Sequence, residues 1–274
     1  MNSFQKSKKR SSKENGDLIG KKNDTVAIEK KEVKEVKEIK LNLKAISKQF
    51  DGDFALKDIN IYVKKGEIVS LIGPSGCGKS TIFNIIADLV KQDSGICDVY
   101  GEISYMYQKN LLLPYKTIID NVCLPLTVKG VKKKDAHKEV SGYFEIFGLE
   151  GYENRYPDEL SGGMKQRANF MRTFVHSNDI MLLDEPFGAL DSITKMSLIE
   201  WFLEIRKKLK PTVMLITHDI DEAIAMSDRI YVLSNKPTVV LEEIDLSSYD
   251  KSRDILELST VKKEVMKIIE INKN

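Results

Sequence analysis

The sequence predicts an α/β protein whose mainly parallel β-sheet is covered by helices on both faces. Strand-like apolar runs alternate with helix-like stretches in the second half of the chain, which is typical of a parallel sheet. The run IVSLI at 68–72 is continuously apolar, as expected of a strand that is buried on both faces. A chain of 274 residues is long enough for one large domain or two modest ones.

The first ordered elements are predicted to begin near residue 39. Apolar residues alternate with polar ones at 39–43 and again at 59–63, so each segment is predicted to be a strand with one buried face. The strand at 68–72 leads into a glycine-rich loop. A helix is predicted after this loop, because the apolar residues recur with helical spacing; they are Ile82, Phe83, Ile85, Ile86 and Leu89.

The middle of the chain predicts a helical subdomain, at about 109–178, inserted between strands. Apolar residues recur with helical spacing in 133–147 and in 164–175, and Gly148 marks the end of the first helix. Strands and helices then alternate again: a strand at 180–183, a helix to about 209, a strand at 212–217, a short helix near 223 and a strand at 229–233. We expect the main domain to span 39–245 and a short helical tail to follow at 246–274.

Composition restricts the function classes. Residues 1–40 carry 12 Lys or Arg and 7 Asp or Glu, and the remainder carries 31 and 34. Residues 1–38 are therefore predicted to be a disordered charged extension, and the body lacks the positive charge of a nucleic-acid binder. Three cysteines fit neither a disulfide framework nor a metal site, so a reducing cytosol is the simplest compartment. No apolar run reaches the length of about 20 residues that spans a bilayer.

The segment GPSGCGKST at 73–81 fits the pattern of a phosphate-binding loop. Its glycines allow backbone N–H groups to approach an anion, together with the N-terminus of the following helix. Lys79 adds a cation for the β- and γ-phosphates, Ser80 offers a hydroxyl to Mg²⁺, and Cys77 is expected to fill space. The predicted nucleotide-binding residues are Gly73, Pro74, Ser75, Gly76, Cys77, Gly78, Lys79, Ser80 and Thr81.

A second set of polar residues follows buried strands at the edge of the sheet where α/β proteins bind ligands. The strand IMLL ends in Asp184, predicted to hold Mg²⁺, and Glu185, predicted to orient and polarise the attacking water. Gln108 follows another predicted strand and is expected to reach Mg²⁺ or the water. His218 follows the run TVMLIT and is expected to contact the γ-phosphate.

The phrase LSGGMKQR at 160–167 completes a set of motifs that resembles the ATP-binding cassette family. The family's motifs follow in order: GPSGCGKST, Gln108, this signature, IMLLDE, GALD at 188–191, and His218. The resemblance runs from about Leu41 to Leu241. It implies a P-loop NTPase (RecA-like) fold with an antiparallel β subdomain and an inserted α-helical subdomain, and it implies that residues 39–245 form an ATPase domain.

The resemblance also implies a head-to-tail homodimer. In this arrangement the segment Ser161, Gly162 and Gly163 of one subunit caps the ATP held by the other, and Asp191 lies along the interface. Bare N–H groups and a hydroxyl at a helix start suit an anion. The family's adenine-stacking aromatic is matched by Phe50, with Phe54 as the alternative.

Finer resemblances favour an importer of the nitrate, sulfonate and taurine group, on segments such as NLLLPYKTIIDNVCLPL (110–126) and THDIDEAIAMSDRIYVLS. They imply a peripheral protein on the cytoplasmic face of the membrane, permease subunits contacted through about 108–126, and an extracellular solute-binding protein as an indirect partner. The sequence does not identify the solute. The alternative is a non-transport cassette that acts as a regulatory or nucleic-acid-linked switch, although we expect no nucleic acid partner.

Overall fold

A six-stranded sheet lies at the centre of the computed structural model, which describes residues 39–188, 190–246 and 255–271. Its strands lie in the order β5-β6-β7-β3-β8-β9. Their bounds are β3 Ile68–Ile72, β5 Ile103–Met106, β6 Ile180–Asp184, β7 Val213–Ile216, β8 Arg229–Leu233 and β9 Val240–Asp245. The pairs from β5 to β8 are parallel, whereas β9 runs antiparallel to β8 at one edge. The predicted mainly parallel sheet is confirmed.

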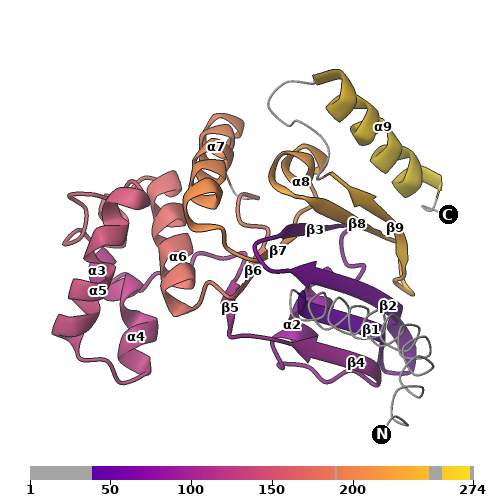
Figure 1. Cartoon of the computed structure of the whole chain (residues 1–274), viewed down its shortest axis with the longest axis horizontal. Coiled ribbons are helices and arrows are strands. Elements are labelled where there is room, and N and C mark those ends of the chain that lie inside the picture. Colours follow the sequence, from indigo (N-terminus) through magenta and orange to yellow (C-terminus); the bar gives the residue numbers. More distant parts are fainter. Residues whose placement is uncertain (1–38, 189, 247–254, 272–274) are drawn as a thin grey trace, which may run out of the picture. The chain divides into compact units, whose positions relative to one another are not determined.

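Both faces of this sheet are buried under helices. In β6, Ile180 and Leu182 belong to one hydrophobic cluster and Met181 and Leu183 to another, because successive side chains of a strand point to opposite faces. The first cluster includes residues of α2 (Lys79–Ile86), and the second includes residues of α6 (Gly162–His176) and α7 (Ser192–Leu209). Figure 1 shows α2 on one side of the central strands and α6 and α7 on the other.

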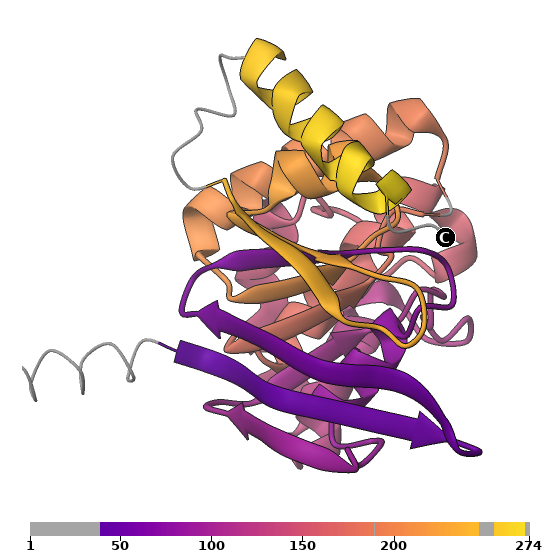
Figure 2. The same ribbon diagram turned by 90° about the vertical axis from the view of Figure 1, so that its right-hand side faces the viewer.

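A second sheet of three strands covers α2 from its other side. β1 (Ile39–Phe50), β2 (Asp53–Lys64) and β4 (Ser94–Val99) lie in the order β2-β1-β4 (Figure 2). Asp51 and Gly52 connect β1 to β2 with φ angles of 54° and 92°, the positive values that a two-residue hairpin turn requires. Leu41 and Ile59 of this sheet pack in the same cluster as Phe83 of α2. The helix that follows the phosphate loop is therefore held between two sheets.

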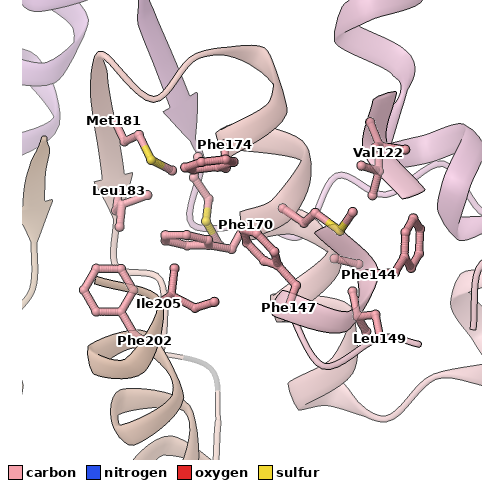
Figure 3. Packing of buried hydrophobic residues seen from close by; sticks show 14 of the residues in the cluster. Val122, Phe144, Phe147, Leu149, Phe170, Phe174, Met181, Leu183, Phe202 and Ile205 are labelled. Carbon is pink, nitrogen blue, oxygen red and sulfur yellow. The ribbon is translucent and has the colours of Figure 1, made fainter. Parts of the chain in front are cut away.

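The inserted helical subdomain lies between β5 and β6, which are neighbours in the sheet. It consists of α3 Ile118–Val122, α4 Leu124–Val128, α5 Lys133–Ile146, the 3₁₀ helix η1 Pro157–Glu159 and α6. Figure 3 shows Phe170 of α6 between Phe147, at the end of α5, and Phe202 of α7. The centroid of the Phe170 ring lies 6.0 Å from that of Phe147 and 5.3 Å from that of Phe202. Because these side chains form one cluster with strands β6 and β7, the subdomain shares its core with the central sheet.

Two helices complete the described chain, α8 (Ile220–Met226) and α9 (Ile255–Ile271). Val261 and Val265 of α9 are buried in a cluster with residues of α8, β8 and β9, and Lys262 Nζ lies 2.7 Å from Asp221 Oδ2. Among the described helices, none combines the length and the apolar character that a bilayer crossing needs. The prediction of a disordered extension concerns residues 1–38, which lie outside the described residues.

The end of α2 differs from the expectation. Leu89 was expected on the buried stripe of this helix, but α2 ends at Ile86 and the Leu89 side chain is 59% exposed. Asp88 adopts a left-handed conformation with φ of 57°, and the N–H groups of Leu89 and Val90 donate to the Asn84 carbonyl at 2.8 and 3.1 Å. A left-handed residue that satisfies the last carbonyls is a usual way to end a helix, and helical spacing alone does not reveal it.

Candidate functional site

The phosphate loop connects the buried strand β3 to α2. Gly76 and Gly78 have φ angles of +75° and +112°, which side chains with a Cβ rarely adopt. A Cβ on Gly78 would lie 2.9 Å from Leu56 Cδ2, so the residue is also restricted by space. Gly78 begins α2 without a side-chain cap. No N-cap side chain therefore competes for the first N–H groups of this helix, which point where an anion can bind.

Lys79 and Cys77 lie inside the loop. The Lys79 ammonium donates to the carbonyl oxygens of Gly73 and Pro74 at 2.8 and 2.9 Å, and the residue is only 7% exposed. Burial raises the pKa of the Cys77 thiol, and this side chain is 2% exposed. The thiol is thus neutral and enclosed, which agrees with the expected space-filling role, while the ammonium is held within the loop.

Asp184 lies opposite the start of α2. Its Oδ2 accepts hydrogen bonds from the Ser80 hydroxyl and the Tyr105 hydroxyl, each at 3.3 Å. Burial raises the pKa of Asp184. Burial and the Asp184 carboxylate together raise the pKa of Tyr105, so the phenol remains protonated and donates. Sequence reasoning missed Tyr105; the available signal was an aromatic residue with a polar tip in the strand that leads to Gln108.

Glu185 lies between two of the predicted polar residues. Gln108 Nε2 donates to Glu185 Oε2 at 2.7 Å, and His218 Nδ1 lies 3.4 Å from Glu185 Oε1. The three residues follow β5, β6 and β7, which are adjacent strands. Glu185 has a φ of 45°, an unfavourable value for a side chain of this kind, and such strain is often found at functional sites. The two adjacent carboxylates have separate partners, since Asp184 contacts Ser80 and Tyr105 while Glu185 contacts Gln108 and His218.

The signature segment lies at the start of α6 and has no hydrogen bond to the phosphate loop among the described residues of this chain. Ser161 caps α6 by accepting from the Met164 N–H at 3.3 Å, and Asp191 caps α7 by accepting from the Thr194 N–H at 3.0 Å. Ser161, Gly162 and Asp191 are exposed. Exposed capped helix starts of this kind are available to a second subunit, as the predicted interface requires.

A buried glutamine connects the signature helix to the carboxylate pair. Gln166 is 9% exposed, and its Nε2 donates to the carbonyl of Pro186, the residue after Glu185. Sequence reasoning did not single out this residue. The bond connects the helix that begins at Gly162 to the chain segment that carries Glu185.

Phe50 and Phe54 are both surface residues at the β1–β2 hairpin, with exposed fractions of 48% and 41%. Lys48 Nζ lies 5.3 Å from the centroid of the Phe50 ring. The structure therefore leaves both aromatic rings accessible to a base.

We expect Phe50→Ala to weaken ATP binding by about 1–3 kcal/mol, the usual contribution of one base stacked on an aromatic ring. Phe54→Ala is the matched comparison, because the residue type and the exposure are nearly the same. Titration of each variant with a fluorescent ATP analogue measures the two affinities. A larger loss in Phe54→Ala would assign the stacking to Phe54 instead.

These features together define a P-loop nucleoside triphosphatase, since the loop offers backbone donors to phosphates and faces a carboxylate pair at the carboxyl edge of the sheet. Comparisons with known proteins agree. The family model described as ABC transporter matches residues 56–188. The formylaminopyrimidine import ATP-binding protein ThiZ of Halalkalibacterium halodurans is 44% identical over 193 residues, which cover 70% of this chain and 78% of that protein.

Two further similarities extend over more of the molecule. The aliphatic sulfonates import ATP-binding protein SsuB of Bacillus cereus is 38% identical over 236 residues, covering 83% of this chain and 93% of that protein. The dimeric structure of MJ0796, a bacterial ABC transporter cassette, is 31% identical with a TM-score of 0.64, and the match covers 75% of this chain and 98% of that chain. The chain belongs to the ATP-binding cassette family of ABC transporter ATPases.

Proposed function

We propose that this chain is the ATP-hydrolysing subunit of an ABC importer that acts as a head-to-tail homodimer against permease subunits at the cytoplasmic face of the membrane. The observation that carries the proposal is an exposed apolar stretch on the helical subdomain, close in sequence to Gln108. We call residues 110–117 the contact segment. In it, Leu111 and Tyr115 are 48% and 72% exposed, and Pro114 is also exposed.

The contact segment is held in place by a buried amide. Asn121 of α3 is fully buried; its Oδ1 accepts from the Leu113 N–H at 2.6 Å, and its Nδ2 donates to the Leu113 and Lys116 carbonyls at 3.0 Å. Leu112 is partly buried and packs against the core of the subdomain, whereas the whole range of about 108–126 was predicted to contact the permease. Because 118–126 forms largely buried helices, the exposed apolar side chains of this region lie in the contact segment. A loop with a fixed shape and exposed apolar side chains is a typical docking surface.

A second connection leads from the contact segment to the signature helix. Arg172 of α6 donates to the Leu111 carbonyl at 2.8 Å and to Asn169 Oδ1 at 2.6 Å. The same helix begins at the signature glycines and contacts Pro186 through Gln166. A partner that moves the contact segment would therefore act on the signature helix and on the Glu185 segment.

The chain's own residues fit the hydrolysis of Mg-ATP. The backbone of the phosphate loop and Lys79 bind the phosphates, and Glu185 orients and polarises the attacking water, with Gln108 and His218 on either side of its carboxylate. Ser80 and Asp184 supply two oxygen atoms of the kind that Mg²⁺ prefers, and Mg²⁺ usually keeps several waters as further ligands. Held by Ser80 and Asp184, this ion would supply positive charge that offsets the charge of the phosphates during phosphoryl transfer.

The names of the relatives indicate a solute class. The similar proteins ThiZ and SsuB are named for import of formylaminopyrimidine and of aliphatic sulfonates. We propose that the transporter served by this chain takes up a small anion of the nitrate, sulfonate and taurine type or a related small molecule. The regulatory or nucleic-acid-linked alternative depends on residues 1–38, which lie outside the described residues.

Reconstitution tests the proposed function. The chain should copurify with a multi-span permease. Vesicles that contain both proteins should transport a radiolabelled sulfonate only when ATP is present on the side of the membrane that carries this subunit. Salt-sensitive binding to DNA or RNA, without recovery of a membrane partner, would favour the alternative.

We expect Tyr115→Asp to abolish recovery with the permease. Truncating a central aromatic contact typically costs about 2 kcal/mol or more, equivalent to about 30-fold in Kd, and a carboxylate adds a desolvation cost. The ATPase activity of the isolated protein should stay within about twofold of the unsubstituted protein, because the side chain does not contact the ATP site. Tyr100→Asp serves as the control, since Tyr100 is 49% exposed and lies outside the helical subdomain. Equal recovery of both variants would contradict the docking role.

A further inference from the structure

A buried group of charges lies between α7 and α8, outside the set of residues discussed so far. Lys195 Nζ lies 2.6 Å from Asp219 Oδ2 and 2.9 Å from Glu222 Oε2. The Lys195 side chain is 16% exposed and that of Glu222 is 2% exposed. One ammonium therefore faces a buried carboxylate, that of Glu222, and a partly exposed one, that of Asp219, whose side chain is 34% exposed.

This charged group holds both neighbours of His218 in the chain. Asp219 follows His218, caps α8 by accepting from two N–H groups, and donates its own N–H to Thr217 Oγ1 at 3.0 Å. Thr217 precedes His218, and its hydroxyl oxygen is the acceptor of this Asp219 N–H. Lys195 thus contacts one flanking residue, Asp219, directly, and Asp219 in turn hydrogen-bonds the other, Thr217. His218 itself is 55% exposed and contacts Glu185 at 3.4 Å, so its position depends on its backbone.

Lys195 also lies in the first turn of α7, beside Asp191. The Lys195 N–H donates to the carbonyl of Asp191 at 2.9 Å, and Asp191 caps this helix through Thr194. Lys195 therefore lies between the two proposed sites, because its backbone bonds Asp191 and its side chain bonds Asp219, the residue after His218. The signature segment also reaches this turn, because a Cβ on Gly163 would lie 3.2 Å from Thr194 Cγ2.

The charge balance depends on Lys195. Burial raises the pKa of Glu222, while the Lys195 ammonium opposes this shift; Glu222 Oε1 has no hydrogen-bond partner among the described residues. Burial also acts to raise the pKa of Asp219, but the hydrogen bond from Lys195 holds it below its ordinary value. Without the ammonium, two carboxylates would remain close together with their counter-charge missing, an arrangement that buried sites tolerate poorly. Asp219 would then move, and the adjacent His218 would move with it.

We propose that Lys195 is a positioning residue for ATP hydrolysis, which holds His218 against Glu185 and couples this pair to the first turn of α7 beside Asp191. The inference rests on the proposed roles of Glu185 and His218. The proposed role requires no contact of Lys195 with the nucleotide. Removing the Lys195 ammonium should therefore lower kcat for ATP hydrolysis and leave ATP binding unchanged.

The first experiment compares Lys195→Met with Arg206→Met. Arg206 is the matched control because it lies at the other end of α7 and also makes an ion pair to a neighbouring segment, with Asp228. In Lys195→Met, kcat of the isolated protein should fall about 10- to 100-fold, the range expected when a reacting group is misplaced by about 1 Å. Its KM for ATP should stay within about twofold and Lys195→Arg should recover most of kcat, because a guanidinium can bridge the same two carboxylates. Arg206→Met should keep kcat within about twofold.

A double-substitution cycle separates positioning from a general loss of structure. If Lys195 acts through His218, adding Lys195→Met to His218→Ala should lower kcat no further. Lys195→Met combined with Glu222→Met replaces the buried ion pair by apolar side chains, which protein interiors accept. This combined variant takes the place of Lys195→Met if the single variant does not fold. This combined variant should still show low kcat, because Asp219 remains without its partner.

The outcomes distinguish this inference from the proposed function. Wild-type kcat in Lys195→Met or in the combined variant would overturn the positioning role, as would equal losses in Lys195→Met and Arg206→Met, or additive losses in the cycle. Full hydrolysis by Glu185→Gln would overturn the assignment of the site itself. Failure to find a permease would affect the importer proposal alone, since every measurement here uses the isolated ATPase.

Discussion

Replacing Glu185 by Gln is expected to lower kcat for ATP hydrolysis by about 10²–10⁴-fold, the usual contribution of a general base. The glutamine keeps the size of the side chain and can still accept the hydrogen bond from Gln108, which is 2.7 Å long. It cannot take a proton from the attacking water. ATP should therefore remain intact between two subunits, and sedimentation velocity with ATP and Mg²⁺ should show a stable dimer.

The control for this experiment is Glu242→Gln, because Glu242 is an exposed carboxylate on β9. It should hydrolyse ATP at the normal rate and show only a transient dimer. Two results would contradict the proposed site: rapid phosphate release by Glu185→Gln, or sedimentation of that variant as single molecules at saturating ATP.

Replacing Gly162 by Val is expected to reduce hydrolysis by about 10²–10³-fold, comparable to the removal of a donor that stabilises charge in the transition state. A Cβ at this position would lie 3.6 Å from the nearest side-chain atom, Leu190 Cδ2, so the folded monomer accepts the change. The added methyl groups would lie where the γ-phosphate of the second subunit is expected. ATP affinity of the monomer, measured by equilibrium dialysis, should be unchanged because residues 73–81 bind the phosphates in the same chain.

Gly142→Val is the matched control, since a Cβ on Gly142 has no atom within 4 Å and the residue lies in α5, away from the signature. It should retain activity apart from a small loss of stability. Equal loss of monomer binding and hydrolysis in Gly162→Val would indicate a folding defect and would argue against a role across the dimer interface.

Local patterns were sufficient to predict much of this molecule. The phosphate loop directly follows the apolar strand at 68–72, and the carboxylates at 184 and 185 directly follow the apolar run at 180–183, so the chemistry of each segment is visible without knowledge of the fold. The continuous apolar runs correctly predicted a sheet buried on both faces. Gln108 and His218 were found because parallel strands end at the same edge, which brings the residues that follow them together.

Other features depend on contacts between distant elements. Tyr105 reaches Asp184 from a neighbouring strand, and Lys195 meets Glu222 across two helices; neither pairing has a local signature. The partial burial of Leu112 against the subdomain core and the hydrogen bonds of Asn121 to Leu113 also join separate segments, so no local pattern reveals them. The prediction that Leu89 continues the helix was wrong because α2 ends before it, at a left-handed Asp88 whose neighbours satisfy the last carbonyl groups.

The placement of the helical subdomain between adjacent strands has a consequence for how such proteins diversify. The chain leaves the sheet after β5 and returns at its neighbour β6, so the two attachment points are only about 10–15 Å apart. An insert anchored at two nearby points can change in length or surface without altering the strands that carry Asp184 and Glu185. An ATPase domain of this kind can in this way acquire a new membrane partner through changes confined to the inserted helical subdomain.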